Sequence, residues 1–263
     1  MLDNIIIQTL GMFLVPFLCI LIPILIGQCY GLFLKSKSGK VNDSPVGSVV
    51  GTSLGLLAFM LAFTFQIVDN RYNSRKELLL NEVTTIRTAY LRAGLIPEPY
   101  RSNSRKLLVE YTNLRVGIVN DVTPEKVEYL KIRSQAILGS LWSYSEALGA
   151  QDRSSEAYSL YMGSINDLID IYNQRITLTF EYRIPVPILW VLFIITLFSM
   201  LILGYQFGIT GKKNNLLAIF ISIIFASVMW LILALDRPEM GFMRLNQNPI
   251  ITLHKQLNSM QQQ

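Results

Sequence analysis

The sequence contains little of the chemistry that enzymes and metal proteins commonly use. It has two cysteines, both in the first apolar stretch, and a single histidine, His254, near the C-terminus. This inventory excludes a disulfide scaffold for the charged part of the chain and any Cys/His metal cluster. No zinc-protease, serine-hydrolase or phosphate-loop motif is present. We therefore expect no catalytic residues, no cofactor and no metal, and a protein that is not an enzyme.

Charged residues are also scarce, at 16% of the chain, whereas hydrophobic residues make up 51%. Soluble domains usually carry about 25% charged residues. The deficit is concentrated in four stretches that contain no Asp, Glu, Lys or Arg: Asn4–Leu34, Ser44–Val68, Ile184–Gly211 and Asn214–Leu235. Each exceeds the ~18 apolar residues that a helix needs to cross a bilayer, and lipid cannot satisfy an open strand edge. The sequence predicts an all-α membrane protein with four transmembrane helices.

The charged middle of the chain lies between the second and third of these stretches. Its acidic and basic residues nearly balance, which argues against a nucleic-acid partner. Apolar residues recur there at three- and four-residue spacing, and Gly/Pro clusters divide the segment into four long helical elements. The predicted organisation is residues 1–69 for transmembrane helices 1 and 2, 70–183 for an inserted helical domain, 184–236 for transmembrane helices 3 and 4, and 237–263 for a C-terminal tail.

Basic residues near the membrane ends predict the topology. Four crossings place both termini and the inserted domain on one side of the membrane. Eight basic residues lie close to membrane ends on that side, against five lysines in the two short loops. Because cytoplasmic loops carry the excess of Lys and Arg, we expect the domain and both termini in the cytoplasm.

The second crossing has the most informative pattern. Small residues follow one of its faces at four-residue spacing and would let another helix approach closely: Gly47, Gly51, Gly55, Ala58 and Ala62. Beside them runs a ladder of bulky apolar residues, also four apart: Phe59, Phe63 and Ile67. The ladder is compatible with packing against lipid or a neighbouring subunit, and equally with an apolar pore constriction that gates by dewetting.

Charged residues return abruptly after the second and fourth crossings. The candidate collar consists of Asp69, Arg71, Arg75, Glu82, Asp236 and Arg237. If four helices cross the membrane, Asp69 and Asp236 should face Arg71, Arg75 or Arg237 in one interfacial layer. These residues can fix the helix ends by salt bridges, and they can also form a charged vestibule that concentrates ions at a pore mouth.

Several short segments resemble the bacterial bestrophin-like domain membrane family. They are the run Gly55–Phe65, Asn70–Tyr72, Arg75 with Lys76, Glu82, Thr88–Ala93, Pro97, and Asp236–Pro238 with Gly241. The layout is also similar to that of bestrophin ion channels, which are homopentamers with four transmembrane helices per subunit and a helical cytosolic domain. In those channels the second helix lines the pore and carries an apolar constriction. The spacing of Phe59, Phe63 and Ile67 matches that constriction.

The resemblance implies an oligomeric ion channel in the bacterial inner membrane. Its partners would be the lipid bilayer, inorganic ions and further copies of the same chain, five by analogy. Calcium gating is not carried over, because the acidic calcium cluster of bestrophins has no counterpart in this sequence. Anion selectivity is not carried over either, because bacterial bestrophins need not share it. An alternative is a non-conducting membrane scaffold or signalling protein whose helical domain binds a cytosolic partner. A third is a membrane enzyme that uses Asp69, Glu82 and Asp236.

Overall fold

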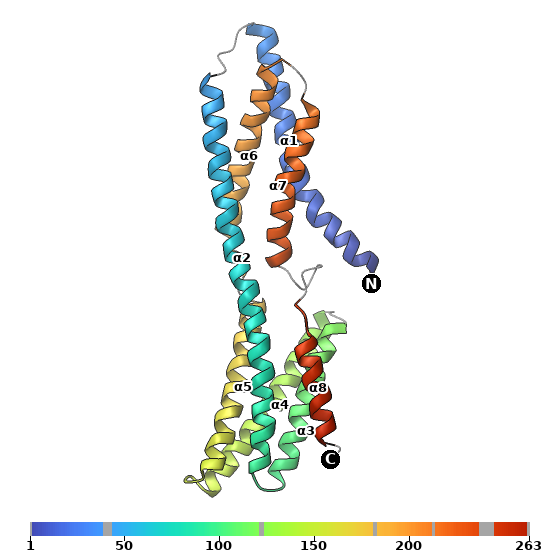
Figure 1. The fold of residues 1–263 in the computed structure, drawn as a ribbon, viewed down its shortest axis with the longest axis vertical. Coiled ribbons are helices and arrows are strands. Elements are labelled where there is room, and N and C mark those ends of the chain that lie inside the picture. Colours follow the sequence, from blue (N-terminus) through green and yellow to red (C-terminus); the bar gives the residue numbers. More distant parts are fainter. Residues whose placement is uncertain are drawn as a thin grey trace. The chain divides into compact units, whose positions relative to one another are not determined.

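The computed structural model describes residues 2–38, 44–120, 124–180, 183–211, 214–236 and 245–261. Within these ranges every regular element is a helix (Figure 1). The elements are α1 (Leu2–Ser38), α2 (Ser44–Arg92), the short 3-10 helix η1 (Ala93–Leu95), α3 (Tyr100–Asn120), α4 (Pro124–Gln151), α5 (Glu156–Phe180), α6 (Val186–Ile209), α7 (Asn215–Asp236) and α8 (Asn248–Gln261). The all-α prediction is confirmed.

The chain divides into two compact units. Unit 1 comprises Met1–Asn73 and Arg183–Arg244, and unit 2 comprises Ser74–Tyr182 and Leu245–Gln263. Helix α2 contributes to both, because it has 49 residues and continues without interruption past the apolar stretch. No proline or glycine lies between Gly55 and Gly94, which explains why the helix does not break there.

Unit 1 contains the apolar helices. Among the described residues, four segments are long and apolar enough to cross a membrane: Leu10–Lys37, Pro45–Leu95, Val186–Ile209 and Asn215–Asp236. Each overlaps one of the four stretches predicted from the absence of charge, and Pro45–Leu95 continues well beyond the end of its stretch at Val68. Helix α1 packs against α6 and α7. Helix α2 contacts α6 through a hydrogen bond that the Ser199 hydroxyl donates to the Ser53 carbonyl, at 3.2 Å.

Glycines set the distance between α1 and α6. A methyl group on Gly27 would overlap the Leu201 carbonyl oxygen, and one on Gly204 would overlap the Ile24 carbonyl oxygen. Gly31 and Gly208 meet the opposite backbone in the same way one turn further along. Two glycine pairs, each with four-residue spacing, therefore bring the backbones of the two helices into direct contact. Sequence analysis did not assign this packing role to them.

Unit 2 is a helical bundle with its own apolar core. Side chains from α2, α3, α4 and α5 are completely buried together, among them Ile86, Leu108, Leu141 and Ile165. Helix α4 packs against α3 and α5. Helix α8 adds Ile250, Leu253 and Leu257 to the same core and packs against α3. The segment predicted only as a tail thus contains an amphipathic helix, visible in the sequence as three apolar residues at three- and four-residue spacing.

Candidate functional site on helix α2

Helix α2 buries one face in unit 1 and leaves the other face open. Leu57, Thr64 and Val68 are completely buried. On the open face, Phe59 is 66% exposed and Phe63 is 49% exposed. Ile67 is half-buried at the edge between the two faces. The bulky ladder predicted from the sequence therefore lies outside the packed core of the single chain.

The predicted stripe of small residues is open as well. Gly51 and Gly55 have no atom of the described residues within 4 Å of the position that a Cβ would take. Ala58 and Ala62 are exposed beside them. Only at Gly47 does a side chain come near, the Gln206 amide nitrogen at 3.5 Å. This face offers room for the close approach of another helix, which the single chain does not supply.

The end of the apolar part of unit 1 carries a charged contact between three segments. The Asp236 carboxylate, at the last residue of α7, lies 3.5 Å from the Arg71 guanidinium of α2. It also accepts a hydrogen bond from the Ile184 backbone N–H, two residues before α6, at 3.2 Å. Asp236 is only 8% exposed, so this contact ties helix ends together. Arg237, the last residue of the predicted collar, lies outside the described residues.

Three further residues of the predicted collar lie in the described part of the chain. Asp69 accepts a hydrogen bond from the Asn73 side chain, one turn along α2, at 3.1 Å. Arg75 is buried, with 7% exposure. Glu82 is completely buried within unit 2. Its burial follows from the period of the helix, because Glu82 lies on the same face of α2 as the buried Leu79 and Ile86.

Glu82 is the centre of a buried polar network in unit 2. Arg115 of α3 donates two hydrogen bonds to it through Nε at 2.9 Å and 3.1 Å, and another through Nη2 at 3.0 Å. The Tyr111 hydroxyl donates a further bond at 2.9 Å, and Nε of Arg175 on α5 lies 3.4 Å away. Burial and the neighbouring Glu82 charge raise the pKa of Tyr111, so its hydroxyl remains a donor. The network joins α2, α3 and α5.

These contacts bear on the enzyme alternative. Two of its three carboxylates, Glu82 and Asp236, are buried, paired with arginines and assigned to different units. Among the described residues, no group of three or more His, Cys, Asp or Glu side chains could hold a metal ion. Glu82 and Asp236 each have an arginine partner within their own unit.

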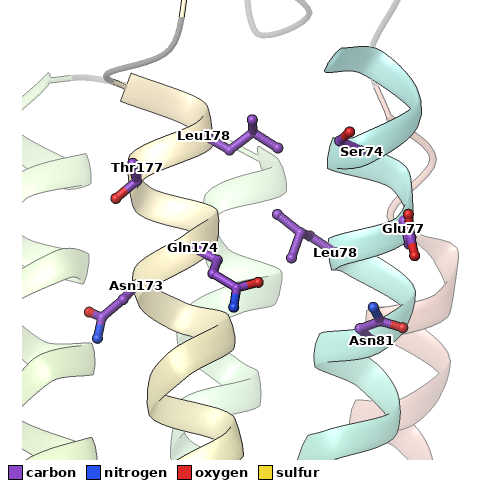
Figure 2. A pocket seen from close by; sticks show the side chains of 8 residues that line it. All are labelled: Ser74, Glu77, Leu78, Asn81, Asn173, Gln174, Thr177 and Leu178. Carbon is purple, nitrogen blue, oxygen red and sulfur yellow. The ribbon is translucent and has the colours of Figure 1, made fainter. Parts of the chain in front are cut away.

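A groove between α2 and α5 in unit 2 was missed by sequence analysis (Figure 2). Its volume is about 600 Å³. It is lined by Ser74, Glu77, Leu78 and Asn81 from α2 and by Asn173, Gln174, Thr177 and Leu178 from α5. In Figure 2, Leu78 and Gln174 point toward one another from the two helices. Most of the lining groups are amides and hydroxyls, which can bind a solute through oxygen or nitrogen.

The fold and the α2 face together define a helical membrane protein with an open helix face. The sequence matches the profile of the bestrophin-like domain over residues 21–250. The chain therefore belongs to the bestrophin-like domain family, as the resemblance in the sequence indicated. A search of curated proteins finds no match to the chain.

Several solved structures share the fold. A tryptophan-to-alanine variant of a bacterial bestrophin homologue from Klebsiella pneumoniae is 17% identical, with a TM-score of 0.70 over 97% of this chain and 98% of that chain. A tyrosine-to-alanine variant of the homologue from the same organism is 18% identical, with a TM-score of 0.63 over 98% and 99%. A membrane protein with a serine-to-alanine substitution is 18% identical, with a TM-score of 0.65 over 97% and 98%.

Proposed function

We propose that the protein is an oligomeric ion channel whose pore is lined by helix α2. Phe59, Phe63 and Ile67 form its apolar constriction. The observation that carries this proposal is the open face of α2, where Phe59 and Phe63 are 66% and 49% exposed although α2 packs its opposite face into unit 1. Membership of the bestrophin-like domain family supports the same function.

The small residues of α2 pack neighbouring subunits in the proposed assembly. The room beside Gly51 and Gly55 admits the backbone of a second copy, and Ala58 and Ala62 extend the same surface. Copies arranged around an axis bring their Phe63 rings together, as in a closed ring with rotational symmetry. Five copies are proposed by analogy with the bestrophin channels that the chain resembles.

The proposed channel lies in the bacterial inner membrane. The inserted domain of residues 70–183 and both termini are cytoplasmic, because the excess of basic residues near membrane ends lies on their side. Arg71 and Asp236 mark the membrane edge on that side, where they form a charged collar with Asp69. The lipid bilayer covers the exposed apolar side chains of α6 and α7, among them Phe198 and Phe220.

The constriction gates by excluding water. A ring of phenylalanine side chains offers no oxygen to replace the hydration shell of an ion, so a narrow apolar segment empties of water and blocks conduction. Reducing the side chains widens the segment and lets water remain. Flux through the pore should therefore rise when Phe63 is made smaller.

Ion flux through purified protein in liposomes tests this function. We expect Phe63→Ala to raise flux over the wild type by roughly 10-fold, because a dewetted constriction is the largest barrier in such a pore. Phe198→Ala is the matched control, since Phe198 is 58% exposed on α6 and is not part of the proposed constriction. It should leave flux unchanged. Oligomer size, measured by native mass spectrometry, must be the same for all three proteins.

A second candidate function is a non-conducting scaffold or signalling protein. Exposed apolar side chains of unit 2 favour it, namely Tyr129 and Ile132 on α4, which are 62% and 58% exposed. They lie three residues apart, on one face of the helix, where a cytosolic partner could bind. Absence of flux in both the wild type and Phe63→Ala, across several cations and anions, would favour this candidate.

A further inference from the structure

The turn between α2 and α3 gathers positive charge. Residues 89–106 contain four basic residues and one acid, namely Arg92, Arg101, Arg105, Lys106 and Glu98. They cover the last turn of α2, the 3-10 helix η1 and the first two turns of α3, all within unit 2 (Figure 1). Within the described part of the chain, none of the four basic side chains takes part in an ion pair.

Two of these cations lie where a helix disfavours positive charge. Arg101 and Arg105 are in the first two turns of α3, at the positive end of its dipole, and their four-residue spacing makes them neighbours on one face. The nearby carboxylate of Glu98 accepts hydrogen bonds from the Ser102 backbone N–H at 3.2 Å and from its hydroxyl at 2.7 Å. These bonds and, to a smaller extent, the two arginines lower the pKa of Glu98. One carboxylate against two guanidiniums leaves a surplus of positive charge at this end of α3.

The Arg105 guanidinium is held in place without an acceptor. Its Cζ lies 5.0 Å from the centre of the Tyr90 ring, a cation–π contact. A Cβ on Gly94 would lie 2.5 Å from Nη2 of Arg105, so glycine leaves the room that this nitrogen occupies. Nε of Arg105 is buried and has no hydrogen-bond acceptor among the described residues, while the side chain as a whole is half-buried. The group is therefore positioned, and its outer N–H donors can be reached from solvent.

Tyr90 adds a second donor without a partner. The residue is 2% exposed, and its hydroxyl has no hydrogen-bond partner among the described residues. Other buried tyrosines of unit 2 avoid this cost, because the hydroxyls of Tyr111 and Tyr161 are hydrogen-bonded to neighbouring side chains. The unpaired hydroxyl thus belongs to the tyrosine whose ring supports Arg105.

We propose that the turn between α2 and α3 binds a phosphate group, with the Arg105 guanidinium and the Tyr90 hydroxyl as hydrogen-bond donors. A guanidinium presents its N–H groups as a fork that matches two phosphate oxygens, and a third oxygen remains for the tyrosine. Arg101 supplies further positive charge one turn earlier on α3, where its Nε donates to the Ile96 carbonyl at 3.0 Å. A phosphate group carries a charge of about −2 near neutral pH, which offsets the surplus of the arginines.

Thermal unfolding of the detergent-solubilised full chain tests the site, with inorganic phosphate compared against potassium chloride at equal ionic strength. We expect phosphate at roughly ten times its dissociation constant to raise the unfolding temperature of the wild type by about 3 °C. Arg105→Gln should remove this rise. Lys106→Gln is the matched control, because the exposed Lys106 is the next residue of α3 and its loss changes the charge equally. It should keep the rise.

Tyr90→Phe separates binding from folding. It removes a hydroxyl that has no partner among the described residues, so the unfolding temperature without phosphate should stay unchanged. Loss of a hydrogen bond to a charged ligand should weaken phosphate binding about 10-fold, which phosphorus-31 NMR line broadening measures. No rise in the wild type, or an equal rise in Arg105→Gln and Lys106→Gln, overturns the site.

The source of the phosphate group is read from a parallel titration with glycerol 3-phosphate, a phosphate monoester. A larger rise than with inorganic phosphate assigns the site to a phosphate group on an organic molecule. An equal or smaller rise assigns it to free phosphate. None of these measurements involves ion flux, so the phosphate site stands or falls separately from the proposed channel.

Discussion

At the scale of single residues, the buried carboxylate of Glu82 is the centre of a polar network. Glu82 is completely buried but satisfied by Arg115, Arg175 and Tyr111. Two arginines face one carboxylate, so these three side chains together carry one more positive than negative charge. Buried ions of this kind are tolerated only while their partners remain, and removing one partner leaves an uncompensated charge.

We therefore expect Glu82→Gln to destabilise the protein strongly. Loss of a partner from a buried ion pair costs roughly 3–5 kcal/mol, which corresponds to a fall in the apparent unfolding temperature of roughly 10 °C. Thermal unfolding of the purified protein in detergent measures it. Glu77→Gln is the control, since the exposed Glu77 should shift the temperature little. An equal shift in the two variants would show that the network contributes nothing to stability.

At the scale of helices, two glycine pairs and one glycine stripe have different roles. Gly27 and Gly204 lie where α1 and α6 touch within one chain. Gly51 and Gly55 lie on the open face of α2 and have free space beside them. The sequence shows the same four-residue spacing in both cases. Spacing alone identifies a face fit for close packing, but it does not say whether the second helix belongs to the same chain.

Gly204→Ala should therefore destabilise the single chain. Its methyl group would overlap the Ile24 carbonyl oxygen, and overpacking of this kind typically costs roughly 1–3 kcal/mol. The apparent unfolding temperature in detergent should fall accordingly. Gly11→Ala is the matched control on α1, because nothing of the described residues lies within 4 Å of its Cβ position. A temperature unchanged from that of Gly11→Ala would mean that the two helices do not touch there.

Gly51→Leu should act on assembly instead. The side chain fits the open space of the single chain but occupies the room in which the proposed neighbouring helix lies. Native mass spectrometry should show a shift from oligomer to smaller species, with helix content by circular dichroism unchanged. If the Gly51→Leu oligomer keeps its full size and abundance, the glycine stripe is not the contact between subunits.

At the scale of the whole molecule, the sequence predicted the helices better than the contacts between them. Absence of charge over four long stretches identified the membrane-spanning candidates, because a bilayer core imposes that composition. Gly and Pro residues marked the ends of α2, α3 and α4, because these residues start or interrupt a helix through their own backbone geometry. Helix α8 was missed because its buried face is formed by only three apolar residues, Ile250, Leu253 and Leu257, which make a short pattern.

The candidate site was predictable only in part. The open face of α2 followed from periodicity within one helix. Glu82 was placed near the membrane edge because it is near in sequence, although it lies 13 residues beyond Asp69, which is about 20 Å along a helix. The groove pairs α2 with α5, which are nearly a hundred residues apart in the chain, and no local pattern reveals such a pairing.

Helix α2 also has a mechanical consequence. Between Gly55 and Gly94 it contains no proline or glycine, which are the residues at which helices most often kink. Phe63 and Glu82 lie on this segment of the helix, 19 residues apart. The helix therefore has no weak point between these two residues at which it would bend easily.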